Sequence, residues 1–106
     1  MAFKIIWSPE AVRDLEDIAE YIGRDSEQYA AAQIGRIVDA IENLALFPRM
    51  GPRVWRVGKG EIRELIEGAY RIIYVIEGDG VHIAAVVHGA RRLGKALKGR
   101  LPKPRH

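Results

Sequence analysis

The sequence predicts an α+β domain. An N-terminal strand leads into an α-helical hairpin that packs on one face of a mostly antiparallel sheet of three to four strands. Two observations carry this prediction: apolar residues recur at helical spacing between residues 9 and 46, and from residue 62 onwards they form short β-branched runs separated by glycines. A chain of 106 residues, 48% of them hydrophobic, can build one core of two packed layers.

The first strand and the first helix are marked by local signals. Phe3–Trp7 is short, apolar and rich in β-formers, which predicts a strand. Ser8 can cap a helix, and Pro9 suits the first helical position. Apolar residues then recur every three to four positions as far as Gly23, a common helix stop, so we expect a helix over residues 9–23.

A second, longer helix is expected over residues 27–46. Ser26 can cap its start, and Phe47-Pro48 ends it. One apolar stripe runs along it, formed by Ala30, Ile34, Ile37, Ile41 and Leu44. Because only a few residues connect the two helices, they form an antiparallel hairpin.

Residues 48–60 combine three glycines and two prolines with four basic residues, which predicts a basic surface loop. Trp55 lies in this segment, and no periodicity accounts for it. Its large aromatic side chain suits either an anchor on a partner protein or a contact with the sheet.

Three strands are expected over Ile62–Ile66, Tyr70–Glu77 and Val81–His88, with a tight turn at Gly78-Asp79-Gly80. The last two strands are apolar on both faces, as in strands that are covered on both sides. Two helices cover only one face of a sheet. We therefore expect the C-terminal tail, the basic loop or another protein to cover the second face.

Charge divides the chain. Residues 1–48 hold four Lys/Arg against nine Asp/Glu, a balance of −5, whereas residues 49–106 hold thirteen against five, a balance of +8. Residues 91–105 carry seven basic side chains and no acidic one. We interpret residues 1–92 as a single domain and 93–106 as a basic tail. A polyanion or an acidic protein would bind such a tail, and a merely solvated tail is the alternative.

Several site classes are not expected. The chain has no cysteine, which excludes disulfides and thiolate metal ligands, and His82, His88 and His106 lack the spacing of a zinc motif. No cofactor or metal is predicted. No apolar run approaches the roughly 18 residues of a membrane span, so we expect a cytoplasmic protein that does not enter the membrane.

The order of these elements, together with particular residues, resembles the RelE/ParE toxin superfamily, and most closely its ParE-like branch, over nearly the whole chain. The matching residues are Trp7-Ser8-Pro9-Glu10-Ala11, Asp14-Leu15, Tyr21-Ile22, Leu44 through Phe47-Pro48 with Gly51, Ile62-Arg63-Glu64-Leu65, Tyr70-Arg71-Ile72-Ile73-Tyr74 and Val87-His88-Gly89-Ala90-Arg91-Arg92. The order and spacing of these fragments within so short a chain carry the resemblance.

The resemblance implies the toxin of a type II toxin–antitoxin system, neutralised by a cognate antitoxin in a heterotetramer or a higher complex. ParE-like members inhibit DNA gyrase, which stops replication and arrests growth. RelE-like members are enzymes that cleave messenger RNA on the ribosome. Whether this chain is an enzyme depends on the branch to which it belongs.

Metal-free RNA cleavage needs an acid, a base and cations around one phosphate. His88, Arg63 and Arg71 could supply these groups, and with Arg91 and Arg92 they also form the expected toxic surface of a ParE-like protein. His88 is followed by Gly89-Ala90, and no tyrosine follows position 74, unlike the nuclease branch. These differences favour the ParE-like function, inhibition of gyrase, over RNA cleavage. A strand-end role for His88, and ordinary ion pairs for Arg63, are the structural alternatives.

The antitoxin is expected to occupy the groove of the helical hairpin and the sheet face. The residues proposed for this contact are Leu15, Ile18, Ile37, Ile41 and Trp55. A basic nucleic-acid-binding module, suggested by the tail alone, is a third function; its binding would weaken steeply with salt.

Overall fold

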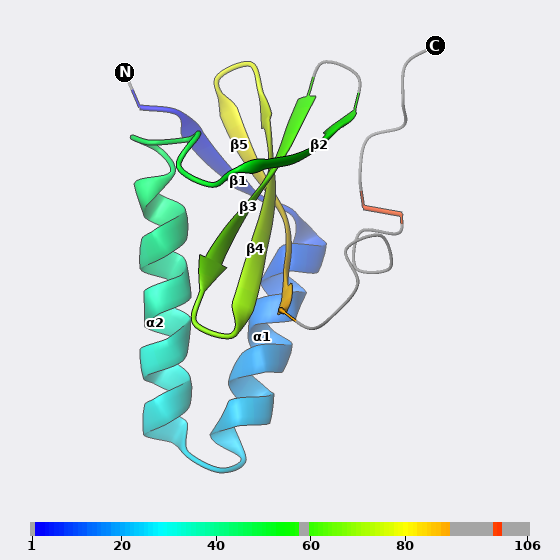
Figure 1. The fold of residues 1–106 in the computed structure, drawn as a ribbon. Helices are drawn as coiled ribbons and strands as arrows, with labels where there is room; N and C mark the ends of the chain where they lie inside the picture. The colour runs from blue at the N-terminus through cyan, green and yellow to red at the C-terminus, as the bar shows by residue number, and fades with distance from the viewer. Residues whose placement is uncertain (1, 58–59, 90–98, 101–106) are drawn as a thin grey trace.

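Two helices and five strands make up the described part of the chain (Figure 1). The computed structural model describes residues 2–57, 60–89 and 99–100, without the side chains of residues 55–57. The elements are β1 (Lys4–Trp7), α1 (Pro9–Gly23), α2 (Glu27–Asn43), β2 (Arg53–Val57), β3 (Gly60–Glu67), β4 (Tyr70–Glu77) and β5 (Gly80–His88). The expected α+β architecture, a helical hairpin on a mostly antiparallel sheet, is confirmed, with five strands in place of three to four.

The helices begin where serine caps were expected. Ser8 Oγ accepts the Ala11 N–H at 3.0 Å, and Ser26 Oγ accepts the Tyr29 N–H at 3.1 Å. Helix α2 stops at Asn43, three residues before the expected end, because residues 44–46 turn more tightly and bond to carbonyls three residues back. None of the described helices is long and apolar enough to cross a membrane.

The sheet has the order β1-β5-β4-β3-β2, in which β1 is parallel to β5 and the other neighbours are antiparallel. Strand β2 lies in residues 48–60, which the sequence had suggested to be a loop, and this expectation was wrong. An edge strand pairs on one side only, so it tolerates exposed arginine and nearby proline and glycine, which a central strand would not.

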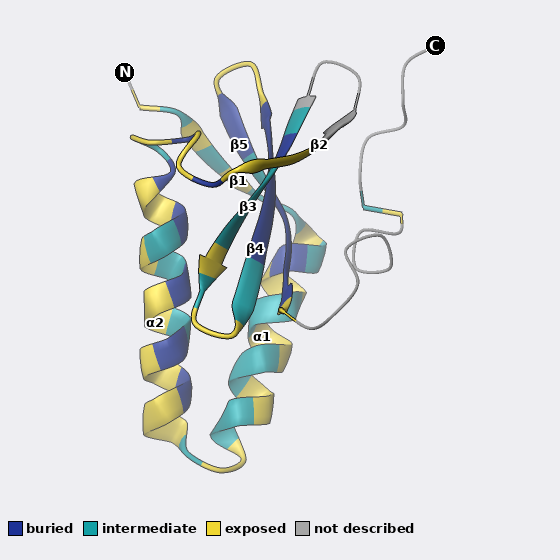
Figure 2. Cartoon of the chain, viewed as in Figure 1, coloured by how far each residue is buried: buried dark blue, intermediate teal, exposed yellow. Residues whose placement is uncertain are grey.

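The sheet is buried on both faces (Figure 2). The helices cover the first face, where Ile72, Tyr74 and Ile76 of β4 join the helical core residues. On the second face a cluster of six side chains is at most 6% exposed: Ile62, Ile73, Val75, Ala84, Ala85 and Val87. The second face is therefore buried at these six positions rather than open.

Candidate functional site

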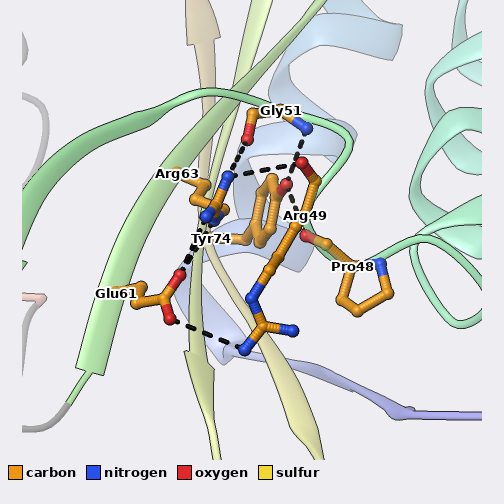
Figure 3. Close-up of polar contacts among 6 residues, drawn as sticks. All are labelled: Pro48, Arg49, Gly51, Glu61, Arg63 and Tyr74. Atoms are coloured by element: carbon orange, nitrogen blue, oxygen red, sulfur yellow. Dashed lines mark hydrogen bonds and ion pairs between the residues drawn. The ribbon is translucent and has the colours of Figure 1, made fainter.

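Arg63 holds the segment that enters β2 (Figure 3). Its Nη1 donates to Gly51 O at 2.7 Å and to Arg49 O at 3.3 Å, while its Nε donates to the Glu61 carboxylate at 3.1 Å. The side chain is only 15% exposed. Arg63, expected to belong to an exposed toxic surface, thus has its donors directed to the protein's own carbonyls and carboxylate.

Tyr74 also binds the segment that enters β2, through the backbone of Pro48 and Gly51. Its buried hydroxyl donates to Pro48 O at 2.8 Å and accepts the Gly51 N–H at 3.1 Å. Burial raises the pKa of the Tyr74 phenol, so the hydroxyl remains a donor well into the alkaline range. We call Tyr74, Arg63 and Glu61, with the backbone of residues 48–51, the loop clamp.

Glu61 makes the loop clamp sensitive to acid. Its carboxylate pairs with Arg63 at 3.0 Å and with Arg49 at 3.5 Å. The hydrogen bond from Arg63 and the charge of Arg49 lower the pKa of Glu61 below its ordinary value of 4.5. A carboxylate with a lowered pKa stabilises the fold above the unfolded-state value, and this contribution is lost as the pH falls through the folded-state value.

We therefore expect the urea midpoint of the wild type to fall between pH 5 and pH 3 more steeply than that of Glu61→Gln, which has no carboxylate to protonate. Urea unfolding at half-unit pH intervals measures the difference. Identical slopes in the two proteins would mean that Glu61 contributes nothing to the acid dependence.

Arg71 lies on the other face of the sheet. It forms an ion pair with Glu64 of the neighbouring strand β3. Because side chains alternate between faces along a strand, Arg71 points away from the face that holds Tyr74, whereas Arg63 pairs with Tyr74 and shares its face. Arg63 and Arg71 therefore cannot surround one phosphate.

His88 is at the end of β5 and pairs with Tyr70 on the helix-covered face. The two rings meet edge to face, with centroids 5.9 Å apart. From the register, His88 and Arg63 are separated by roughly 13 Å along the strands and roughly 10 Å across them. The expected convergence of His88, Arg63 and Arg71 is not found. Arg91 and Arg92 lie outside the described residues.

Among the described residues, α1 lines two grooves. The edge groove, of about 410 Å³, lies between α1 and the end of β5 and is lined by Asp14, Asp17, Ile18, Tyr21, Tyr70, Val86, Val87 and His88. The hairpin groove, of about 650 Å³, lies between the end of α1 and the start of α2 and is lined by Ala19, Glu20, Gly23, Arg24, Glu27, Ala30, Ala31 and Ile34. Both have the mixed apolar and polar lining of binding sites.

The residues expected to contact a partner have different positions. Ile18 lines the edge groove, and Leu15 is half-buried against the core. Ile37 and Ile41 are completely buried, because the apolar stripe of α2 faces the sheet. Their side chains fill the core, which corrects the expectation that they contact a partner. The side chain of Trp55 is outside the described part of the structure.

Asp14 has a role that the sequence did not indicate. Its Oδ2 accepts the Val86 N–H at 3.0 Å and pairs with Arg100 at 2.6 Å. Arg100 also donates to Ala84 O at 3.3 Å, and its hydrogen bond with Asp14 raises the pKa of the guanidinium. Arg100 belongs to the segment expected to be a tail, yet it lies against α1 and β5. Only the fold could reveal a contact between residues so distant in sequence.

The profile of a family described as the ParE toxin of the type II toxin–antitoxin system parDE matches residues 5–93. The chain belongs to this ParE toxin family. The match spans every described helix and strand apart from the first residue of β1. The chain is thus a toxin of a toxin–antitoxin system. Membership of this family implies that its partner is a cognate antitoxin.

Relatives and a solved structure agree with this assignment. The ParE-family chain is 33% identical to Toxin RelE2 of Caulobacter vibrioides over 89 residues, which cover 83% of this chain and 97% of that protein. It is also 33% identical to the Y4kP protein of Sinorhizobium fredii, over 89% of this chain and 96% of that one. A structure of the chromosomal ParDE system of P. aeruginosa has the same fold, with a TM-score of 0.66 and 17% identity, over 82% of this chain and 96% of that one.

Proposed function

We propose that this toxin inhibits DNA gyrase in the cytoplasm by binding to it, without catalysing a reaction of its own. The separation of His88, Arg63 and Arg71 carries the proposal. General acid–base cleavage of RNA requires its groups within hydrogen-bonding reach of one substrate, whereas these residues lie on two faces and at two ends of the sheet. The family description, ParE toxin, supports the same choice.

Ribosome-dependent cleavage of messenger RNA is the rival function, and the name of the Caulobacter relative, Toxin RelE2, makes it the necessary comparison. Purified toxin should inhibit gyrase-catalysed supercoiling of plasmid DNA and leave messages intact in a translating extract. Cleavage of translated messages without an effect on supercoiling would reverse the assignment.

The His88→Ala substitution should leave gyrase inhibition and growth arrest within about twofold of wild type, because His88 lies at the exposed end of β5, far from Arg63 and on the opposite face of the sheet from Arg71. Dose–response curves for supercoiling, and induction of the variant in cells, measure both effects. Loss of growth arrest accompanied by loss of message cleavage would establish His88 as a catalytic residue.

We further propose that the antitoxin occupies the hairpin groove and extends along α1 towards Ile18. An amphipathic helix would fit the hairpin groove, whose lining includes Gly23 and the small and aliphatic side chains of Ala19, Ala30, Ala31 and Ile34. Ala31→Glu should weaken antitoxin binding by about tenfold or more in a calorimetric titration, since it places a charge against an apolar partner surface. Unchanged affinity would exclude this groove.

A further inference from the structure

Three large apolar side chains lie exposed in the stretch of residues 46–50, which follows α2. Leu46 is 67% exposed, Phe47 61% and Met50 49%. Scattered exposed apolar residues are ordinary on protein surfaces, but contiguous ones usually mark a binding site. We call Leu46, Phe47 and Met50 the apolar patch; next to it lies a recess of about 410 Å³ lined by Phe47, Pro48, Arg49 and Met50.

The backbone beneath the apolar patch is held firmly. The Phe47 N–H donates to Asn43 O at 3.0 Å, and the Met50 N–H donates to Phe47 O at 3.1 Å. The loop clamp binds the carbonyls of Pro48, Arg49 and Gly51 (Figure 3). Exposure of these side chains is thus a fixed feature of the fold. A partner that binds them has little loop-ordering entropy to overcome.

Positive charge borders the apolar patch. Arg49 and Arg63 share the carboxylate of Glu61, and the exposed Arg53 lies opposite Arg63 in the β2–β3 register. This cluster of Arg49, Arg53, Arg63 and Glu61 therefore has three positive charges and one negative charge. The complementary surface is a protein surface that has an apolar recess edged by carboxylates.

The hairpin groove is lined by the first half of α2, whereas the apolar patch follows the last residue of that helix, Asn43. A helix of 17 residues is about 25 Å long, so the second half of α2 separates the apolar patch from the hairpin groove. We propose that the apolar patch and its arginine border are the surface with which the toxin contacts its acidic target protein. This inference rests on the proposed function, inhibition by binding.

The test replaces the apolar patch with Leu46→Ser, Phe47→Ser and Met50→Ser together. Ile66→Ser, which removes an apolar side chain of similar exposure (59%) from β3, is the matched control. We expect the triple variant to inhibit gyrase supercoiling at least about tenfold more weakly and to lose growth arrest, while antitoxin affinity stays within about twofold. The control should behave as wild type.

Thermal unfolding shows whether each variant is folded. If the triple variant does not fold, the single substitution Phe47→Ser is used in its place.

The outcomes separate this inference from the proposed function. If the triple variant inhibits gyrase as strongly as the wild type does, the inference is wrong and the proposed function, inhibition of gyrase, still stands. If wild type arrests growth without inhibiting gyrase, the proposed target is wrong, and loss or retention of growth arrest in the triple variant still decides the role of the apolar patch. Loss of antitoxin affinity with growth arrest retained assigns the patch to the antitoxin. If the triple variant loses both binding to duplex DNA and toxicity, the apolar patch binds nucleic acid. Either of these last two results, the loss of antitoxin affinity or the loss of DNA binding, overturns the inference.

Discussion

Gly51→Ala is expected to lower the free energy of unfolding by about 3 kcal/mol, at the upper end of the overpacking range. A Cβ at this position would lie 2.4 Å from Glu64 O and 2.9 Å from the Tyr74 hydroxyl. The first of these atoms is backbone, so β3 or the loop must move, which disrupts the loop clamp. In a domain of about 100 residues the thermal midpoint would fall by roughly 12 to 24 °C, measurable by circular dichroism.

Gly35→Ala is the matched control for this substitution. A Cβ at Gly35 meets nothing within 4 Å, and the residue is inside helix α2, where alanine is more favourable than glycine by up to about 1 kcal/mol. This variant should be as stable as wild type or slightly more stable. A Gly51→Ala protein as stable as Gly35→Ala would show that the loop yields without cost.

Tyr74→Phe is expected to lower the free energy of unfolding by about 2 to 4 kcal/mol. The substitution keeps the ring in the core but removes the hydroxyl, which leaves the Gly51 N–H and the Pro48 carbonyl without their buried partner. Each unsatisfied buried group costs about 1–3 kcal/mol. Urea unfolding measures the difference, which should appear as a shift in midpoint at unchanged slope.

Tyr29→Phe provides the comparison for Tyr74→Phe, because Tyr29 is exposed at the start of α2 and its hydroxyl reaches water. Its effect should remain within about 0.5 kcal/mol, as for most surface substitutions. Equal effects of the two substitutions would indicate that the hydroxyl of Tyr74 does not hold the loop. That result would also weaken the argument that the loop clamp presents a fixed apolar patch.

Local signals in the sequence determined much of the fold. Ser8 with Pro9 and Ser26 mark the starts of both helices because a side-chain oxygen can satisfy a free N–H only at a helix end. The β-branched run Tyr70–Glu77 forms β4 over the same residues that the pattern predicted. The order of these elements, with the residues that the family shares, was enough to indicate the family.

Only the tertiary structure decided how these elements are used. Face alternation and strand register place Arg63 and Arg71 on opposite faces, although each lies in a strand that the sequence predicted. The position of the sheet decides that the stripe of Ile37 and Ile41 forms core rather than an open surface, and it brings Arg100 to Asp14. Helix caps and periodicity arise between residues a few positions apart, so a sequence displays them. Register, faces and long-range pairs arise from packing between distant segments, and one sequence alone does not specify which segments meet.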